Sequence, residues 1–160
     1  MINKDKLEKY TNVYNNKRES FMDRNQFKLI HSELIQQVQC VESNLKIIYA
    51  AMHKGNFNNN LKSVEKMNLG KIARELEYLD NSDDMPEFSE EEYNTIDEIR
   101  EIRNYWCHQC YLDFVYIEND YEREKAFQRV AKKLHYDEYR TYDLFEKTEE
   151  MRFIIMKKYR

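Results

Sequence analysis

The chain has 160 residues, with 26 Lys and Arg against 30 Asp and Glu, which gives a formal net charge of −4. This length suits a single domain that spans residues 1–160 and buries about 70% of the surface that the unfolded chain exposes. Two Gly and one Pro leave little material for the turns of a sheet protein, while Glu, Lys, Leu, Arg and Met favour helix. Composition therefore excludes a sheet-rich fold and predicts an all-α bundle of four or five helices.

The charges are unevenly distributed along the chain. Residues 75–101 carry twelve acidic residues and one Arg, whereas residues 1–74 carry thirteen Lys and Arg against seven acids, and residues 102–160 carry twelve against eleven. This balance is compatible with an RNA substrate, but it is not the strongly basic field of a high-affinity nucleic-acid binder. The acidic segment is interpreted as a solvated loop, or as a surface that repels wrong partners or meets a basic protein.

The sequence contains no apolar segment of the length that a membrane requires. Its N-terminal stretch is polar and lacks the apolar region of a signal peptide, and no stretch approaches the roughly 20 apolar residues of a membrane span. The three Cys, an odd number, are typical of reduced thiols inside the cell. We therefore expect a cytoplasmic protein that does not bind membranes.

Four helical segments and one loop are predicted in chain order before the turn at residue 119. Residues 3–20 suggest a short charged helix, weakened by three Asn. Residues 25–54 repeat apolar residues at the spacing of an amphipathic helix, which Gly55 and the Asn58-Asn59-Asn60 run are expected to end. Residues 61–80 predict a shorter helix, with a break near Gly70 as the alternative to a continuous one.

The second half of the chain begins with a loop over residues 81–88, which includes Pro86. Ser89 followed by Glu92 is a capping box, so a helix is expected to begin near residue 89 or 90 and to run to about residue 117. After a turn near residue 119, residues 121–160 have a helical pattern, with a break predicted near residues 136–139. The sequence shows no internal repeat and no domain linker.

The most informative stretch is Arg-Asn-Tyr-Trp-Cys-His at residues 103–108. Arginine is a permanent cation that grips phosphate in a fork, and histidine titrates near neutral pH, so the pair suits phosphodiester chemistry. On a helix that turns about 100° per residue, one stripe of apolar residues faces the core. These residues are Ile96, Ile99, Trp106 and Cys110.

Asn104 and His108 are four residues apart and fall on the opposite side of the predicted helix, in line with Tyr111 and Val115. This second stripe is part polar and part aromatic, and a partner subunit would cover it and build a cleft around the two polar groups. Arg103 lies near the edge of the core stripe, so only its long stem can bring the guanidinium toward His108.

The pattern Arg103-Asn104-x-x-x-His108, late in a long helix with an acidic start, resembles the HEPN (higher eukaryotes and prokaryotes nucleotide-binding) superfamily. The segment Met67-Asn68-Leu69-Gly70-Lys71-Ile72-Ala73 is similar to the Leu-Gly segment that opens a helix upstream of the motif in many HEPN proteins. The resemblance covers about residues 25–118 as a HEPN-like core, which leaves residues 119–160 as a C-terminal helical extension.

The resemblance implies a metal-independent endoribonuclease, built as a homodimer whose two Arg-His motifs face each other across a shared cleft. Such proteins commonly serve as toxins of toxin–antitoxin pairs or as effectors of phage defence. It implies that His108 acts as general base or acid on the ribose 2′-hydroxyl and the leaving oxygen, that Arg103 holds the scissile phosphate, and that Asn104 orients the phosphate or the imidazole. No cofactor is expected, and the expected partners are RNA and an antitoxin or nucleotidyltransferase.

The sequence departs from one HEPN variant at Cys110. In toxins whose motif continues His-x-Tyr, the Tyr is nucleotidylated by a partner antitoxin, whereas here Tyr111 comes one residue later, rotated by about 100°. We therefore do not expect that mode of control. Many HEPN domains also lack catalysis, so the alternative function is a non-catalytic helical module that binds proteins.

Structural alternatives exist for each candidate residue. His108 could be a surface or dimer-interface imidazole, and Arg103 could form an ordinary ion pair with Glu98 or Glu101. The run Cys107-His108-Gln109-Cys110 resembles half of a zinc site, but the sequence has no second Cys pair and would need Cys40 or His135 as further ligands, so no metal is expected. The remaining histidines are interpreted as surface or packing residues: His31, His53 and His135.

Overall fold

A computed structural model describes residues 22–82 and 84–160. The helix predicted over residues 3–20 lies outside the described residues. Within the described residues the chain forms helices and no strands, which confirms the predicted all-α fold. The helices are α2 (Arg24–Met52), α3 (Phe57–Val64), α4 (Leu69–Asp80), α5 (Glu90–His108) and α6 (Asp120–Tyr159).

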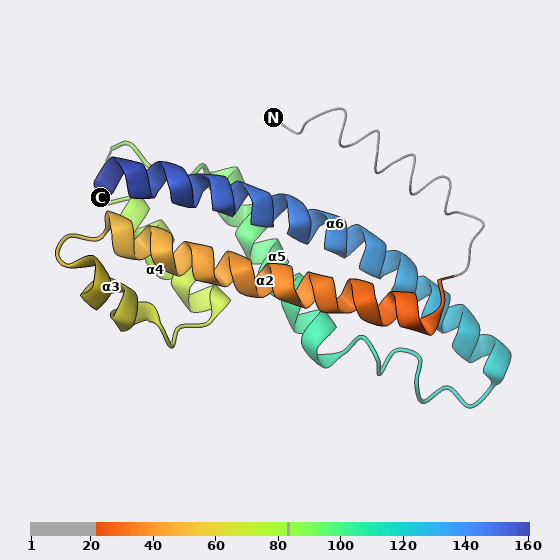
Figure 1. Cartoon of the computed structure of the whole chain (residues 1–160). Helices are drawn as coiled ribbons and strands as arrows, with labels where there is room; N and C mark the ends of the chain where they lie inside the picture. The colour runs from red at the N-terminus through yellow and green to blue at the C-terminus, as the bar shows by residue number, and fades with distance from the viewer. Residues whose placement is uncertain (1–21, 83) are drawn as a thin grey trace.

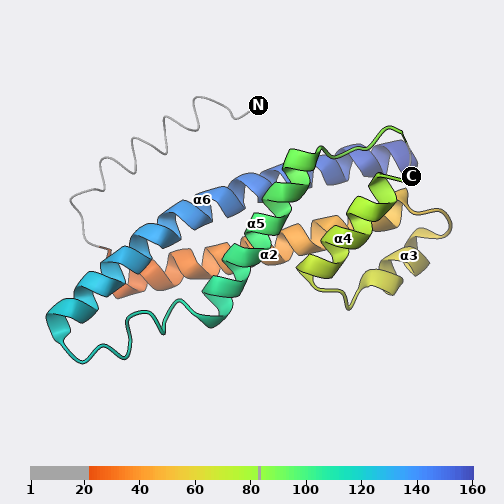
Figure 2. The same ribbon diagram turned by 180° about the vertical axis from the view of Figure 1, so that it is seen from behind.

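The two longest helices, α2 and α6, lie side by side and run in the same direction (Figures 1 and 2). The hydrogen bonds between the two helices join residues in the same order along both. Gln37 Nε2 donates to Glu138 Oε1 at 2.9 Å, and further along Asn44 Nδ2 donates to Thr148 Oγ1 at 3.2 Å. This parallel pair forms one layer of the bundle.

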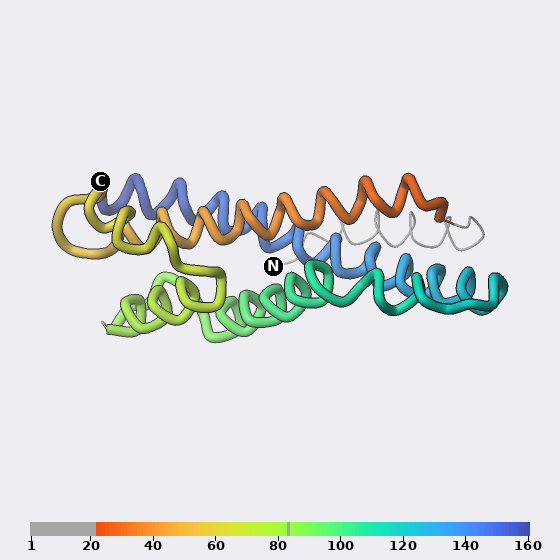
Figure 3. Tube along the Cα trace, turned by 90° about the horizontal axis from the view of Figure 1, so that it is seen from below, coloured from red at the N-terminus to blue at the C-terminus, as the bar shows by residue number. Residues whose placement is uncertain are grey.

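Helices α4 and α5 pack on one side of the α2–α6 pair (Figure 3). Helix α5 runs antiparallel to α6, because its start is tied to the second half of α6 and its end to the first half. Glu92 forms an ion pair with Lys147 at 3.0 Å, and Trp106 Nε1 donates to Asp137 Oδ2 at 2.8 Å. The last turns of α5, which carry the motif, therefore lie beside the middle of α6.

The core at this end of the bundle is aromatic. The ring centroids of Phe27 and Phe127 are 5.2 Å apart, and those of Phe27 and Trp106 are 6.2 Å apart. Phe114, from the segment after α5, packs edge-on against Phe127 with centroids 5.2 Å apart. Since α2, α5 and α6 each contribute a ring, helix α6 shares this core with the earlier helices.

The helix predicted over residues 25–54 is confirmed as α2, but the role given to the Asn run is wrong. Gly55, with φ of 104°, follows the end of α2 as expected, whereas Asn58–Asn60 lie inside α3. Asn56 caps α3 by accepting from Asn59 N at 3.1 Å. The Asn60 amide donates to the carbonyl of His53 at 2.9 Å, so it satisfies the end of α2 from within the next helix.

The break predicted near Gly70 is found earlier in the chain, between α3 and α4. Asn68 is the N-cap of α4 and accepts from Lys71 N at 3.0 Å, so Gly70 lies in the first turn of α4. A Cβ at Gly70 would lie 2.8 Å from Cδ of Arg100. The glycine therefore permits a close approach of α4 to α5, and it does not end a helix.

The break predicted near residues 136–139 is wrong, because α6 is continuous from Asp120 to Tyr159. The buried row of α6 includes the polar residues Asp137 and Thr141. Asp137 accepts from Trp106, and Thr141 Oγ1 donates to the carbonyl of Asp137 at 2.8 Å. Because these polar atoms have partners, they occupy core positions without breaking the helix.

The predicted loop is non-helical over its described residues, 81–82 and 84–88, and one carboxylate binds its end. Asp80, at the end of α4, is buried and accepts hydrogen bonds from the backbone N–H groups of Glu87 and Phe88 at 2.7 and 3.0 Å. It also accepts from the Tyr93 hydroxyl at 2.8 Å. Burial and then this carboxylate raise the pKa of Tyr93, so the hydroxyl stays a donor and fixes the start of α5.

Candidate functional site

Helix α5 begins as the sequence predicts. Ser89 and Glu92 form the capping box: Ser89 Oγ accepts from Glu92 N at 3.2 Å, and Glu92 accepts from Ser89 N at 2.7 Å. Three acidic residues occupy the first turn, where the positive end of the helix dipole favours them. The predicted core stripe is confirmed for Ile96, Ile99 and Trp106, which are buried on α5. Cys110 is buried as well, but it lies beyond the end of the helix.

The end of α5 differs from the prediction, because the helix stops at His108 and not near residue 117. Two side chains bind one carbonyl oxygen of its last turn. His31 Nε2 donates to the carbonyl of Trp106 at 2.8 Å, and the Cys110 thiol donates to the same oxygen at 3.4 Å. These bonds compete with continuation of the helix, and residues 109–116 form a series of turns.

Asp113 holds this series of turns against the helix. It accepts from the Tyr105 hydroxyl at 2.6 Å and from Gln109 Nε2 at 2.9 Å. The hydrogen bond from Tyr105, then that from Gln109, lowers the pKa of Asp113. Burial, then the hydrogen bond with this carboxylate, raises the pKa of Tyr105. The pair therefore remains a neutral donor and a charged acceptor across the physiological pH range.

The three predicted catalytic residues lie on the last turns of α5 with their polar groups available. Asn104 and His108 are exposed and Arg103 is half-buried. Among the described residues, no hydrogen bond or ion pair engages any of the three side chains. The alternative explanation of Arg103 as an ion-pair partner is wrong, because Glu98 pairs with Arg140 and Glu101 with Arg100.

A single chain brings only two of the three residues to one face. Asn104 and His108 are one turn apart on the exposed side of α5. Arg103 and His108 are five residues apart, which is about 140° around the helix, and no hydrogen bond joins them. Within one chain, the guanidinium of Arg103 and the imidazole of His108 therefore start from different sides of α5.

Tyr111 and Val115 do not form the predicted second stripe, because they lie after the end of α5. Both are exposed, as are Leu112 and Tyr116 in the same segment. The Tyr111 ring nevertheless packs on one side against Phe27, with centroids 5.8 Å apart. The segment after His108 thus presents a short exposed apolar run, which we define as Tyr111, Leu112, Val115 and Tyr116.

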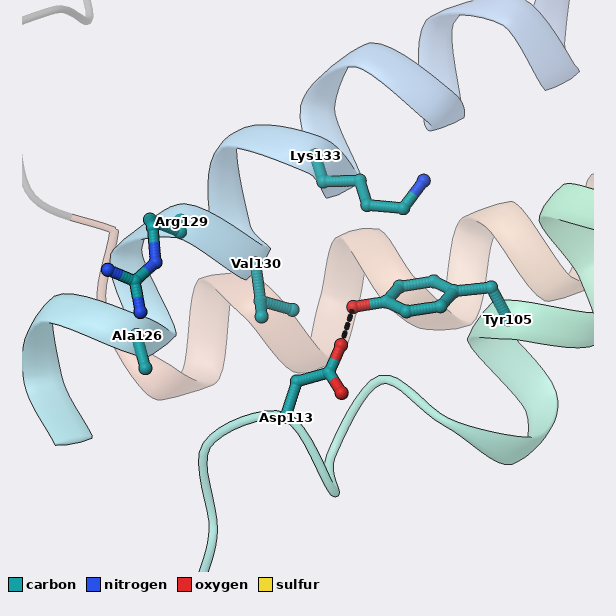
Figure 4. Close-up of a pocket in the computed structure, with 6 residues that line it drawn as sticks. All are labelled: Tyr105, Asp113, Ala126, Arg129, Val130 and Lys133. Atoms are coloured by element: carbon teal, nitrogen blue, oxygen red, sulfur yellow. Dashed lines mark hydrogen bonds between the residues drawn. The ribbon is translucent and has the colours of Figure 1, made fainter. Parts of the chain in front are cut away.

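A shallow cleft of about 330 Å³ lies between the end of α5 and the first half of α6 (Figure 4). Arg129 and Lys133 line it from α6, Tyr105 from α5 and Asp113 from the following turns. This cleft was not predicted from the sequence. The spacing of Arg129 and Lys133 at i and i+4 was visible in the sequence, but Asp113 was assigned to a helix and could not be placed opposite them.

The zinc alternative receives no support from the placement of the thiols. Cys107 is exposed, while Cys110 is buried beneath the end of α5, and burial raises the pKa of the Cys110 thiol to about 11. In residues 22–82 and 84–160, no group of three or more His, Cys, Asp or Glu side chains is placed to hold a metal ion. His31 is a packing residue as predicted, stacked on Phe27 with centroids 6.2 Å apart.

Comparison with protein-family models, with curated proteins and with solved structures finds no match. The fold and the site define the protein as an all-helical bundle with an exposed Asn104–His108 pair. The resemblance to the HEPN superfamily stays a prediction from the residues. No helix in the described part of the chain is both long enough and apolar enough to cross a membrane.

Proposed function

We propose that the protein is a metal-independent endoribonuclease of the HEPN type, which acts as a homodimer and serves as a toxin or phage-defence effector. One observation carries the proposal. Asn104 and His108 lie on one exposed face at the end of α5, without intramolecular partners among the described residues, and the exposed apolar run follows directly after them. Unpaired polar groups beside exposed apolar surface are typical of a site that a second subunit completes.

The proposed reaction uses the ribose of the substrate as the nucleophile. One His108 imidazole removes the proton of the 2′-hydroxyl, whose oxygen attacks the adjacent phosphorus, and the bond to the 5′-oxygen of the next nucleotide breaks. The imidazolium that forms then gives its proton to that leaving oxygen. The products are a 2′,3′-cyclic phosphate and a 5′-hydroxyl end, so the reaction needs no cofactor.

Arg103 supplies the positive charge in this proposal. Its planar guanidinium can donate two parallel hydrogen bonds to a phosphate, and no carboxylate in the described residues occupies it. The negative charge on the phosphate oxygens grows in the transition state, so a fixed cation stabilises that state more than the bound substrate. Asn104, one turn before His108, orients the phosphate or the imidazole in this proposal.

Cleavage of RNA without divalent metal is the direct test of the proposed function. Purified protein incubated with single-stranded RNA in EDTA is expected to produce fragments that end in a 2′,3′-cyclic phosphate, because the 2′-hydroxyl is the nucleophile. Mass spectrometry of the fragments identifies these ends. An RNA with 2′-O-methyl groups is the matched control and should stay intact. Absence of cleavage, or fragments that end in a 3′-hydroxyl, would contradict the proposal.

A second candidate function is a non-catalytic module that binds another copy or another protein. The exposed apolar run favours it, because four bulky apolar side chains within six positions are exposed together. In this case the motif residues would serve only as neighbours of the contact surface. Replacing Arg103 with alanine would then leave every measurable function unchanged, whereas the nuclease proposal expects cleavage to be lost.

The exposed apolar run is expected to mediate self-association. Val115→Asp should shift the protein from dimer to monomer in analytical ultracentrifugation, because it places a charge in a contact that excludes water. Tyr111→Ala should weaken the dimer as well. Ile154→Asp is the matched control, since Ile154 on α6 is 47% exposed and Val115 is 48% exposed. A wild-type protein that sediments as a monomer at all concentrations would contradict both candidate functions in their dimeric form.

A further inference from the structure

One face of α6 carries cations without carboxylates over three turns. We define this basic face of α6 as Lys125, Arg129, Lys132, Lys133 and Tyr136. All five residues are exposed. At about 100° of rotation per residue, they fall within an arc of about 100° around the helix.

The acidic residues of this part of α6 lie elsewhere on the helix. Glu124 pairs with Arg24 of α2, and Glu138 accepts a hydrogen bond from Gln37 of α2. Asp137 is buried. On the arc of the basic face itself, the nearest carboxylates are Glu122 and Asp143, beyond its two ends. The positive charge is therefore concentrated on the side of α6 that does not pack against α2.

Three of these four cations have no partner within residues 22–82 and 84–160. No hydrogen bond or ion pair among the described residues engages Lys125, Arg129 or Lys132. Two pairs on the face, Lys125 with Arg129 and Arg129 with Lys133, are four residues apart, a spacing at which like charges destabilise a helix. An anionic ligand bound along this face would relieve that repulsion. Binding of such a ligand would therefore explain why like charges are found at this spacing.

The basic face also carries an aromatic platform. Tyr136 is 58% exposed, and the guanidinium carbon of Arg140 lies 5.6 Å from its ring centroid. Bases of a single strand stack on exposed aromatic rings while lysine and arginine follow the phosphates. A membrane-binding helix instead inserts several bulky apolar side chains, and this face offers only the tyrosine. The composition therefore favours a single-stranded nucleic acid over an anionic membrane.

The basic face continues into the cleft beside α5. Lys133 Nζ forms an ion pair with Asp137 at 2.6 Å. It also lies 4.7 Å from the ring centroid of Tyr105, and Figure 4 shows these two side chains beside each other. The one carboxylate that lines the cleft, Asp113, already accepts a hydrogen bond on each oxygen. Tyr105 and His108 are three residues apart and hence neighbours on the surface of α5.

We propose that the basic face of α6 binds the phosphate backbone of single-stranded RNA and leads the strand across Tyr105 toward His108. Tyr136 holds one base by stacking, and Lys125, Arg129 and Lys132 contact successive phosphates. The direction of the strand toward His108 rests on the proposed function, whereas the binding of RNA to α6 does not depend on cleavage. The proposal places substrate recognition on a helix that carries none of the three motif residues.

The test compares two triple variants with equal loss of charge. In K125Q/R129Q/K132Q the basic face loses three cations, while Lys133 is kept because it holds the buried Asp137. In the control K54Q/K66Q/K71Q three exposed lysines near α3 and α4 change instead. The probe is a fluorescent 2′-O-methyl oligouridylate, which cannot be cleaved through its 2′-oxygen, and binding is followed by anisotropy across a salt series.

The two variants are expected to differ in affinity and in salt dependence. Each phosphate contact contributes about 0.7 to the slope of log affinity against log salt for a single strand, so the basic-face variant should lose about 2 from that slope. The control triple variant should keep the wild-type slope. Tyr136→Ala should weaken binding by about tenfold through the loss of stacking, while Phe153→Ala, which removes another exposed aromatic ring of α6, should not.

Three outcomes would overturn the inference: no binding of the oligouridylate, equal losses in the two triple variants, or dependence on the same residues only for phosphatidylserine vesicles. The outcome is separable from the nuclease proposal. Binding that depends on the basic face, without cleavage of ordinary RNA in EDTA, supports the inference and contradicts the nuclease. Cleavage that is unchanged in K125Q/R129Q/K132Q supports the nuclease and contradicts the inference.

Discussion

Replacing His108 with alanine is expected to slow RNA cleavage by a factor of about 100 to 10,000, which is the usual contribution of a general acid or base. The fold should be unaffected, because His108 is exposed and has no intramolecular partner among the described residues. Its free energy of unfolding should therefore stay within about 0.5 kcal/mol of the wild-type value. Initial rates of cleavage in EDTA, together with urea unfolding of the same samples, measure both quantities.

His53→Ala is the matched control for this variant, since His53 lies just past the end of another helix, α2. A sharper test mixes two inactive proteins, Arg103→Ala and His108→Ala. If the guanidinium of one protomer acts with the imidazole of the other, mixed dimers contain one intact pair and should regain activity that neither variant has alone. A mixture that stays inactive although its dimers exchange subunits would contradict the shared site, and an active His108→Ala protein would contradict the catalytic role altogether.

Replacing Trp106 with alanine is expected to lower the free energy of unfolding by about 4 kcal/mol, within the range for truncating a buried tryptophan. The side chain is fully buried among the aromatic rings of the core. The change also removes the Nε1–H donor from the buried carboxylate of Asp137, which leaves Lys133 as its side-chain partner. Urea unfolding followed by circular dichroism measures the change, because the variant lacks the only tryptophan of the chain.

Two further variants separate packing from hydrogen bonding at this position. Trp106→Phe keeps a six-membered ring but not the donor, so it should cost about 1.5 to 3 kcal/mol, the range for a lost hydrogen bond to a charged group. Tyr116→Ala is the surface control: Tyr116 is 78% exposed, and its loss should change stability by less than about 0.5 kcal/mol. Equal costs for Trp106→Ala and Tyr116→Ala would contradict the packing described for this end of the bundle.

The sequence predicted the helices well where the determinants are local. The spacing of apolar residues located α2, and the Ser89–Glu92 capping box located the first residue of α5, because both signals lie within a few residues of the position they specify. The predicted ends of helices were wrong where the end is determined by side chains that are distant in the sequence. The end of α5 depends on His31, which bonds the carbonyl of Trp106 from 75 residues away in the sequence. Periodicity within one segment contains no information about such a partner.

The candidate site was predicted in part for the same reason. The positions of Asn104 and His108 on one face follow from helical geometry alone, and the structure agrees. The stripe that was to include Tyr111 and Val115 required the helix to continue past His108, and that continuation is prevented by tertiary contacts. The polar core residues of α6 posed a similar difficulty, since Asp137 acts as a core residue only once Trp106 is packed beside it.

The parallel pairing of α2 with α6 has a consequence for how the chain is made. The hydrogen bond between Met22 and Gln128 joins positions 106 residues apart, so during synthesis α2 leaves the ribosome long before its neighbour exists. Until then the part of α2 that packs against α6 stays exposed, and closing so large a loop slows the final step of folding. Nascent or truncated chains that lack α6 are consequently expected to be aggregation-prone intermediates, which a chaperone or a protease would recognise.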